Sequence, residues 1–66
     1  MKLTVNGKEK ELRESINIDE MLMQFNLDCA GIVIELNGKI VKKDKWKSFK
    51  LQENDTVEII SFVGGG

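Results

Sequence analysis

Few residues of this sequence could take part in covalent chemistry, and the most suitable group lies at its C-terminal end. Gly64-Gly65-Gly66 follows directly on an apolar stretch that ends in Phe62 and Val63. A terminal glycine presents a carboxylate without a neighbouring side chain, and the glycines before it would fit a narrow channel. This tail suits insertion into the active site of another protein, where Gly66 would be activated as an acyl-adenylate. An incidental, frayed terminus is the alternative interpretation.

The other candidate groups favour structural roles. The sequence has one cysteine and no histidine, so it allows no internal disulfide and lacks the usual imidazole ligand for a metal. Cys29 stands between Asp28 and Ala30 without a neighbouring basic residue, which favours a structural thiol. Asp19 and Glu20 fit the N-terminal end of a helix better than acid–base catalysis. We therefore expect no bound metal or cofactor and no catalysis by the chain alone.

Length and charge limit the function further. The 66 residues make a single domain. With 10 basic and 11 acidic residues the net charge is −1, which argues against nucleic-acid binding, because such proteins need a basic surface for phosphate contacts. No apolar run approaches the roughly 20 residues of a membrane span, and the N-terminus has no signal-peptide pattern. A free thiol suits a reducing compartment, so we expect a cytoplasmic location.

Two Asn-Gly pairs, Asn6-Gly7 and Asn37-Gly38, predict tight β-hairpins, because both central turn positions require a positive φ angle. A further apolar run, from Thr56 to Val63, predicts the last strand. The strands of the two hairpins are expected at residues 3–5 and 8–12, and at residues 31–36 and 39–41.

One main helix is predicted from Ile18 to about Asn26. Asn17 is a suitable N-cap and Glu20 completes a capping box, while apolar residues recur at helical spacing after Ile18. A short helical turn is expected within residues 44–49.

This order of elements predicts an α+β fold of the β-grasp type, with a mixed four- to five-stranded sheet and the helix packed on one face. The first and last strands should lie parallel at the centre of the sheet. The domain is expected to cover residues 1–63, with a flexible glycine tail at residues 64–66.

Two surfaces could bind a partner. Along the last strand, alternation places Ile59 under the helix and Ile60 and Phe62 on the open face of the sheet, where Val33 would join them. An exposed apolar patch beside a reactive tail is a candidate docking site. Trp46 is a further candidate, because tryptophan is enriched in interface hot spots, although it could instead pack over the edge of the sheet.

Several motifs follow one another along the chain: 3-LTVNG-7, the helix beginning at residue 18, 36-LNG-38, Val41 followed by Trp46, 55-DTVEII-60 and 63-VGGG-66. Taken in this order, they resemble those of the thiamine-biosynthesis sulfur carrier family, the prokaryotic relatives of ubiquitin, over the whole of residues 1–66. Two departures are visible: Asn54 stands where family members often have glycine, and Lys42 where they often have proline. Asn tolerates the left-handed conformation, so the turn at Asn54 is retained.

The resemblance implies a carrier and co-substrate that is not itself an enzyme, with a ubiquitin-like β-grasp fold. An adenylating, E1-like partner enzyme would use ATP to activate the Gly66 carboxylate, and Gly64 and Gly65 would form the flexible approach. Sulfur that starts with a cysteine desulfurase would then convert Gly66 to a thiocarboxylate. Thiazole synthase would take this sulfur to build the thiazole ring of thiamine.

Three alternatives remain open from the sequence. A molybdopterin-synthase small subunit shares the fold and the tail, although such chains are usually longer. A ubiquitin-like protein modifier would use the same tail to form an isopeptide bond with lysine. A plain binding module would carry the glycines without using them.

Overall fold

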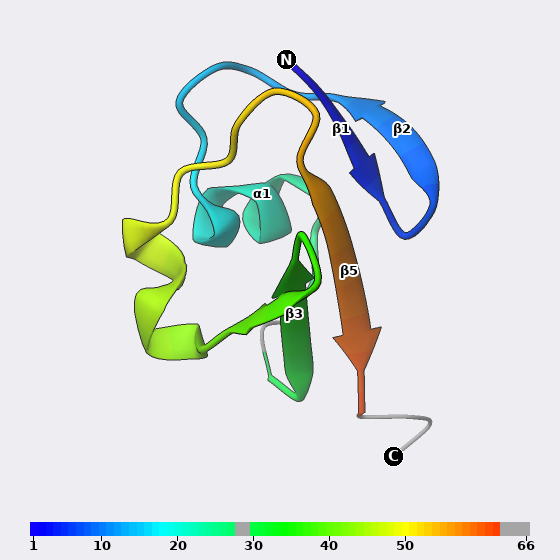
Figure 1. Cartoon of the computed structure of the whole chain (residues 1–66). Helices are drawn as coiled ribbons and strands as arrows, with labels where there is room; N and C mark the ends of the chain where they lie inside the picture. Colours follow the sequence, from blue (N-terminus) through cyan, green and yellow to red (C-terminus); the bar gives the residue numbers. More distant parts are fainter. Residues whose placement is uncertain (28–29, 63–66) are drawn as a thin grey trace.

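The computed structural model describes residues 1–27 and 30–62, and the described part forms one sheet covered by two helical segments (Figure 1). The N-terminal residues lie at the top of Figure 1, and strand β5 points away from them. The elements are β1 Lys2–Val5, β2 Lys8–Glu11, α1 Ile18–Gln24, β3 Ile32–Leu36, β4 Lys39–Val41, the 3-10 helix η1 Lys43–Ser48 and β5 Thr56–Ser61.

The strands follow the order β2-β1-β5-β3-β4 across the sheet. Strands β1 and β5 pair in parallel, whereas the pairs β1–β2, β3–β4 and β3–β5 are antiparallel. The first and last strands are therefore neighbours, with β5 at the centre. The predicted mixed sheet of the β-grasp fold is confirmed.

Both predicted hairpins form, because the Asn-Gly pairs adopt the left-handed conformations that a two-residue turn demands. Asn6 and Gly7 have φ angles of 50° and 81°, and Asn37 and Gly38 have φ angles of 52° and 85°. Positive φ at both central positions is the type I′ pattern, whose twist matches that of the flanking strands. The sequence therefore sets the register of both hairpins locally.

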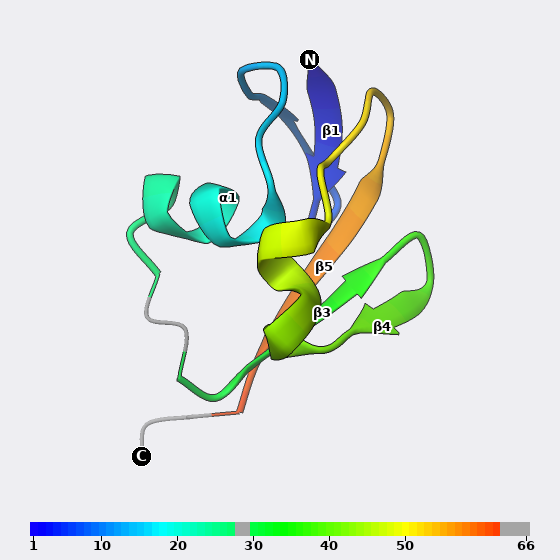
Figure 2. The same ribbon diagram turned by 90° about the vertical axis from the view of Figure 1, so that its left-hand side faces the viewer.

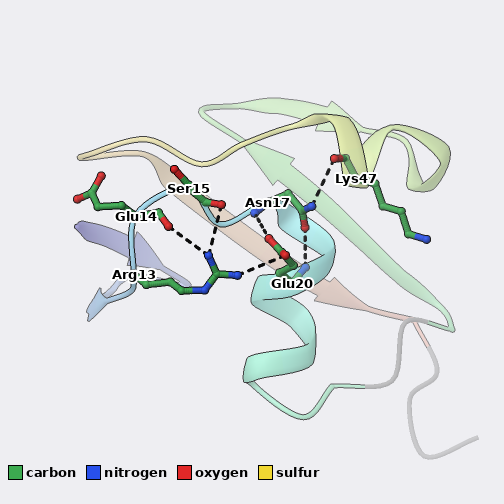
Figure 3. Close-up of polar contacts among 6 residues, drawn as sticks. All are labelled: Arg13, Glu14, Ser15, Asn17, Glu20 and Lys47. Atoms are coloured by element: carbon green, nitrogen blue, oxygen red, sulfur yellow. Dashed lines mark hydrogen bonds and ion pairs between the residues drawn. The ribbon is translucent and has the colours of Figure 1, made fainter.

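Helix α1 begins with the predicted capping box (Figure 3). The Asn17 Oδ1 atom accepts from the backbone N–H of Glu20 at 2.7 Å, and the Asn17 backbone N–H donates to Glu20 Oε1 at 3.0 Å. These bonds satisfy two donors that a helix start would otherwise leave unpaired. The helix ends at Gln24, slightly earlier than predicted, because Asn26 adopts a left-handed φ of 59° and closes the last turn.

The core lies between the sheet and the two helical segments, which lie on the same side of β5 in Figure 1. Ile18, Met21 and Leu22 of α1 are fully buried, as is Val57 of β5 beneath them. Helix η1 contributes Trp46, which is 1% exposed. Within the described ranges, no helix is both long and apolar enough to cross a membrane.

Candidate functional site

Strand β5 carries the candidate site, because it leads directly into the glycine tail. Ser61 pairs with Ile32 of β3, and the backbone N–H of Phe62 donates to the carbonyl of Gly31 at 2.8 Å. The β3–β5 pairing thus continues to the last described residue before the tail. Val63 and the predicted reactive and approach residues, Gly64, Gly65 and Gly66, lie outside the described residues, as does Cys29.

Two asparagine side chains hold β5 from its two sides. Asn6 Oδ1 accepts from the backbone N–H of Ile59 at 2.7 Å, and Asn37 Oδ1 accepts from the backbone N–H of Thr56 at 2.9 Å. Asn37 Nδ2 also donates to Asp55 Oδ1 at 2.9 Å. Each asparagine also forms a hairpin turn, so both turns are tied to the strand that leads to the tail.

The structure brings the predicted open-face residues together beside the root of the tail. Val33 and Ile60 lie directly opposite each other in the β3–β5 ladder, and both are half-buried. Alternation places Phe62 on the same face, and its side chain is 71% exposed. We call Val33, Ile60 and Phe62 the tail-side patch.

A neighbouring row of open-face residues, formed by Glu58, Glu35 and Ile40, was not predicted from the sequence. Glu35 lies opposite Glu58 of β5 on one side and opposite Ile40 of β4 on the other, and Ile40 is 66% exposed. The alternation within β4 indicates the exposed position of Ile40, because only Val41 of this strand is buried in the core. The open face is therefore mixed, with two facing carboxylates beside the apolar residues.

Trp46 does not belong to a surface site, which corrects its assignment as a candidate docking residue. Its side chain is 1% exposed, and its indole N–H donates to the carbonyl of Val41 at 2.9 Å. A buried indole needs such a partner, and here it also covers the end of β4. Trp46 is a core residue, in line with the packing alternative stated above.

The tail-side patch is apolar, and none of its three side chains is titratable. Among the described residues, no group of three or more cysteine, aspartate or glutamate side chains is placed to hold a metal ion. The hydrogen bond from the Asn17 backbone N–H lowers the pKa of Glu20, which lies at the start of α1 and away from the tail-side patch.

One main helix packed on a mixed five-stranded sheet, with the last strand at its centre, defines a β-grasp fold. The ThiS family model matches residues 3–66. A sulfur carrier protein, ThiS, from Bacillus subtilis is 32% identical over 65 residues, which cover 97% of this chain and 98% of that protein. The chain belongs to the ThiS family.

A solved structure supports the fold assignment at full length. The crystal structure of the thiamine biosynthesis protein ThiS from Geobacter metallireducens superposes with a TM-score of 0.86 and 35% identity, and the match covers 100% of both chains. A thiazole synthase from Paramagnetospirillum magneticum is 32% identical over 66 residues. The match covers 100% of this chain but only 20% of that longer protein.

Proposed function

We propose that this protein carries sulfur for thiamine biosynthesis as a thiocarboxylate on Gly66. The observation that supports this most directly is the construction of β5. The central strand is hydrogen-bonded up to Phe62, and the exposed Phe62 and the half-buried Val33 and Ile60 lie beside the point where the tail begins. Such a strand gives a partner a rigid surface to bind while the glycines enter its active site.

The chemistry needs only the tail carboxylate and a partner enzyme. A carboxylate oxygen of Gly66 attacks the α-phosphorus of ATP in the adenylating enzyme, and pyrophosphate leaves. The terminal sulfur of a protein persulfide, charged by a cysteine desulfurase, then displaces AMP from the acyl carbon. A thiol reduces the resulting acyl disulfide and releases the thiocarboxylate. The carrier itself supplies the acyl group and an unhindered approach to it.

Thiazole synthase is the proposed acceptor of the sulfur. The similarity of this whole chain to about a fifth of proteins named thiazole synthase supports a direct functional connection. Joining a carrier to its acceptor would raise the effective concentration of one for the other. A protein-bound thiocarboxylate would deliver sulfur to one site without free sulfide, which suits the reducing cytoplasm that we propose for this reaction.

The tail-side patch is the proposed docking surface for the adenylating enzyme. Four residues follow Phe62, and at about 3.5 Å each an extended tail reaches roughly 14 Å. A partner that binds Val33, Ile60 and Phe62 must therefore hold its reactive centre within that distance. Burial of an aromatic side chain such as Phe62 is a common source of interface affinity.

A reconstituted reaction tests the proposed function. The intact chain, the adenylating enzyme, a persulfide donor, ATP and thiazole synthase are combined, and formation of the thiazole product is followed. Removal of Gly66 should abolish product formation, whereas Met23→Ala on the exposed side of α1 should leave it unchanged. Product formation by the chain without Gly66 would contradict the proposal. Transfer of the activated tail to a lysine amine instead of sulfur would support the protein-modifier alternative.

A further inference from the structure

A second surface lies at the opposite end of β3 from the tail. A groove of about 780 Å³ runs between β4 and η1 and is lined by Leu36, Asn37, Lys39, Ile40, Val41, Lys42, Lys45 and Phe49. Figure 2 shows β4 at the outer side of the sheet, next to η1. Ile32, beside the root of the tail, and Leu36, in the groove, are four residues apart on β3, which corresponds to about 13 Å.

Every charged residue that lines the groove is basic. Lys39, Lys42 and Lys45 are exposed, and none of them has an ion pair within residues 1–27 and 30–62. This concentration of positive charge contrasts with the net charge of −1 for the whole chain. An acidic ligand would therefore meet only positive side chains among the charged residues of this groove.

The groove also exposes apolar side chains and borders an unpaired strand edge. Ile40 is 66% exposed and Phe49 is 43% exposed. Strand β4 is the last strand of the sheet on this side, so its outer edge has no strand partner in the described part of the chain. An extended peptide can add to such an edge through main-chain hydrogen bonds, while its side chains enter neighbouring pockets.

We propose that this groove binds an extended, acidic and apolar segment of the adenylating enzyme, in addition to the contact at the tail-side patch. The acidic side chains of that segment would pair with Lys42 and Lys45, and its apolar side chains would cover Ile40 and Phe49. This inference rests on the proposed function, because it assigns a second contact to the same partner.

The need for specificity favours the adenylating enzyme over the sulfur acceptor. A carboxylate on a terminal glycine is the same chemical group on any carrier or modifier that ends in glycine. An enzyme that activates such a tail must therefore distinguish its partner by surfaces away from the tail. The acceptor acts only on tails that have already been converted to a thiocarboxylate, so the first selection among carriers falls to the adenylating enzyme.

A matched pair of charge reversals tests this proposal. Lys42→Glu/Lys45→Glu changes the groove, whereas Lys43→Glu/Lys47→Glu changes two lysines of η1 that do not line it. Each double variant changes the net charge equally, from −1 to −5, since each reversal removes one positive and adds one negative charge. The backbone bond from the Lys45 N–H to the Lys42 carbonyl, at 2.8 Å, does not depend on either side chain. Thermal unfolding of both variants checks that they remain folded.

The affinity of each full-length variant for the adenylating enzyme is measured by calorimetry at low and high salt. The proposal predicts at least a tenfold weaker Kd and a smaller salt dependence for the groove variant, with the control pair within about threefold of the original chain. Equal weakening by both pairs, unchanged binding of the groove variant, or a loss confined to thiazole synthase would each contradict it. At saturating concentration the groove variant should still be converted to the thiocarboxylate. Absence of conversion in the original chain would instead contradict the proposed function.

Discussion

The side chain of Asn6 continues the pairing between β1 and β5 after β1 has ended. Its Oδ1 atom accepts from the Ile59 N–H at 2.7 Å, and its Nδ2 donates to the Ile59 carbonyl at 3.4 Å. The backbone register of the two strands covers only two pairs, the last of which is Val5 with Val57. Asn6 therefore supplies an extra rung on the half of β5 that is closer to the tail.

Asn6→Gly is expected to lower the free energy of unfolding by about 1–2 kcal/mol, because the Ile59 N–H loses its acceptor without new strain at the turn. Glycine accepts the positive φ of this position, so the turn keeps its geometry in the variant. Urea unfolding measures the loss, and hydrogen exchange should show faster exchange of the Ile59 amide. Asn6→Asp keeps the acceptor atom and should be less destabilising. Equal stability of Asn6→Gly and the original chain would contradict this role.

Replacement of the buried indole should affect stability and not partner binding. Trp46→Phe leaves the Val41 carbonyl without its side-chain donor and removes buried volume, so we expect a loss of about 1–3 kcal/mol. Chemical unfolding followed by far-UV circular dichroism measures this loss. Under conditions where the variant is fully folded, its Kd for the adenylating enzyme should match that of the original chain. Weaker binding by the folded variant would restore Trp46 as a docking residue.

The local patterns of the sequence were sufficient to predict most of the fold. The Asn-Gly pairs and the capping box depend on contacts within a few residues, and each appears in the structure as predicted. The side-chain bonds of Asn6 and Asn37 to β5 could not be predicted in the same way. They join residues far apart in the sequence, and they require the sheet order to be known.

The surface assignments show the same difference. Alternation within β5 correctly placed Ile60 and Phe62 on the open face, because neighbours in one strand decide it. The burial of Trp46 depends on how η1 packs against the end of β4. No short sequence pattern predicts that packing. Alternation within β4 predicts which face Ile40 occupies, but its exposure follows only from the position of β4 at the edge of the sheet.

Truncation of the exposed aromatic side chain should weaken partner binding with little effect on folding. Phe62→Ala is expected to reduce affinity for the adenylating enzyme roughly tenfold to a hundredfold, as for a central interface aromatic. Because Phe62 is 71% exposed, the substitution should change the free energy of unfolding of the protein by less than about 0.5 kcal/mol. Met23→Ala is the matched control, since Met23 is 61% exposed on α1. Equal effects of the two substitutions on Kd would contradict the assignment of the patch.

Acid should weaken the start of helix α1 through Glu20. The hydrogen bond from the Asn17 N–H is the main cause that lowers the pKa of Glu20 (Figure 3). Partial desolvation raises this pKa, and the Arg13 guanidinium, 3.3 Å from the Glu20 carboxylate, lowers it further. Because the folded state favours the ionised form, this stabilisation is present above the ordinary carboxyl pKa. It is lost as the pH falls through the lowered pKa of the folded state.

Glu20→Gln keeps the capping geometry but removes the charge. The variant should be less stable than the original chain at neutral pH, and the difference should disappear at low pH. Thermal unfolding across the acidic range measures this convergence. Glu9→Gln, at an exposed position of β2 without an ion pair in the described residues, should show a smaller difference at neutral pH. A Glu20→Gln difference that is constant across the acidic range would rule out the charge as its cause.

The intact mass of the protein after reaction tests the sulfur-carrier account most directly. The full chain is incubated with the adenylating enzyme, ATP, a persulfide donor and a reducing thiol. The account predicts a mass increase equal to the replacement of one oxygen by sulfur, located at Gly66 by fragmentation and absent from the chain that lacks Gly66. An unchanged mass, in the presence of a partner enzyme that demonstrably activates the original chain with ATP, would contradict it.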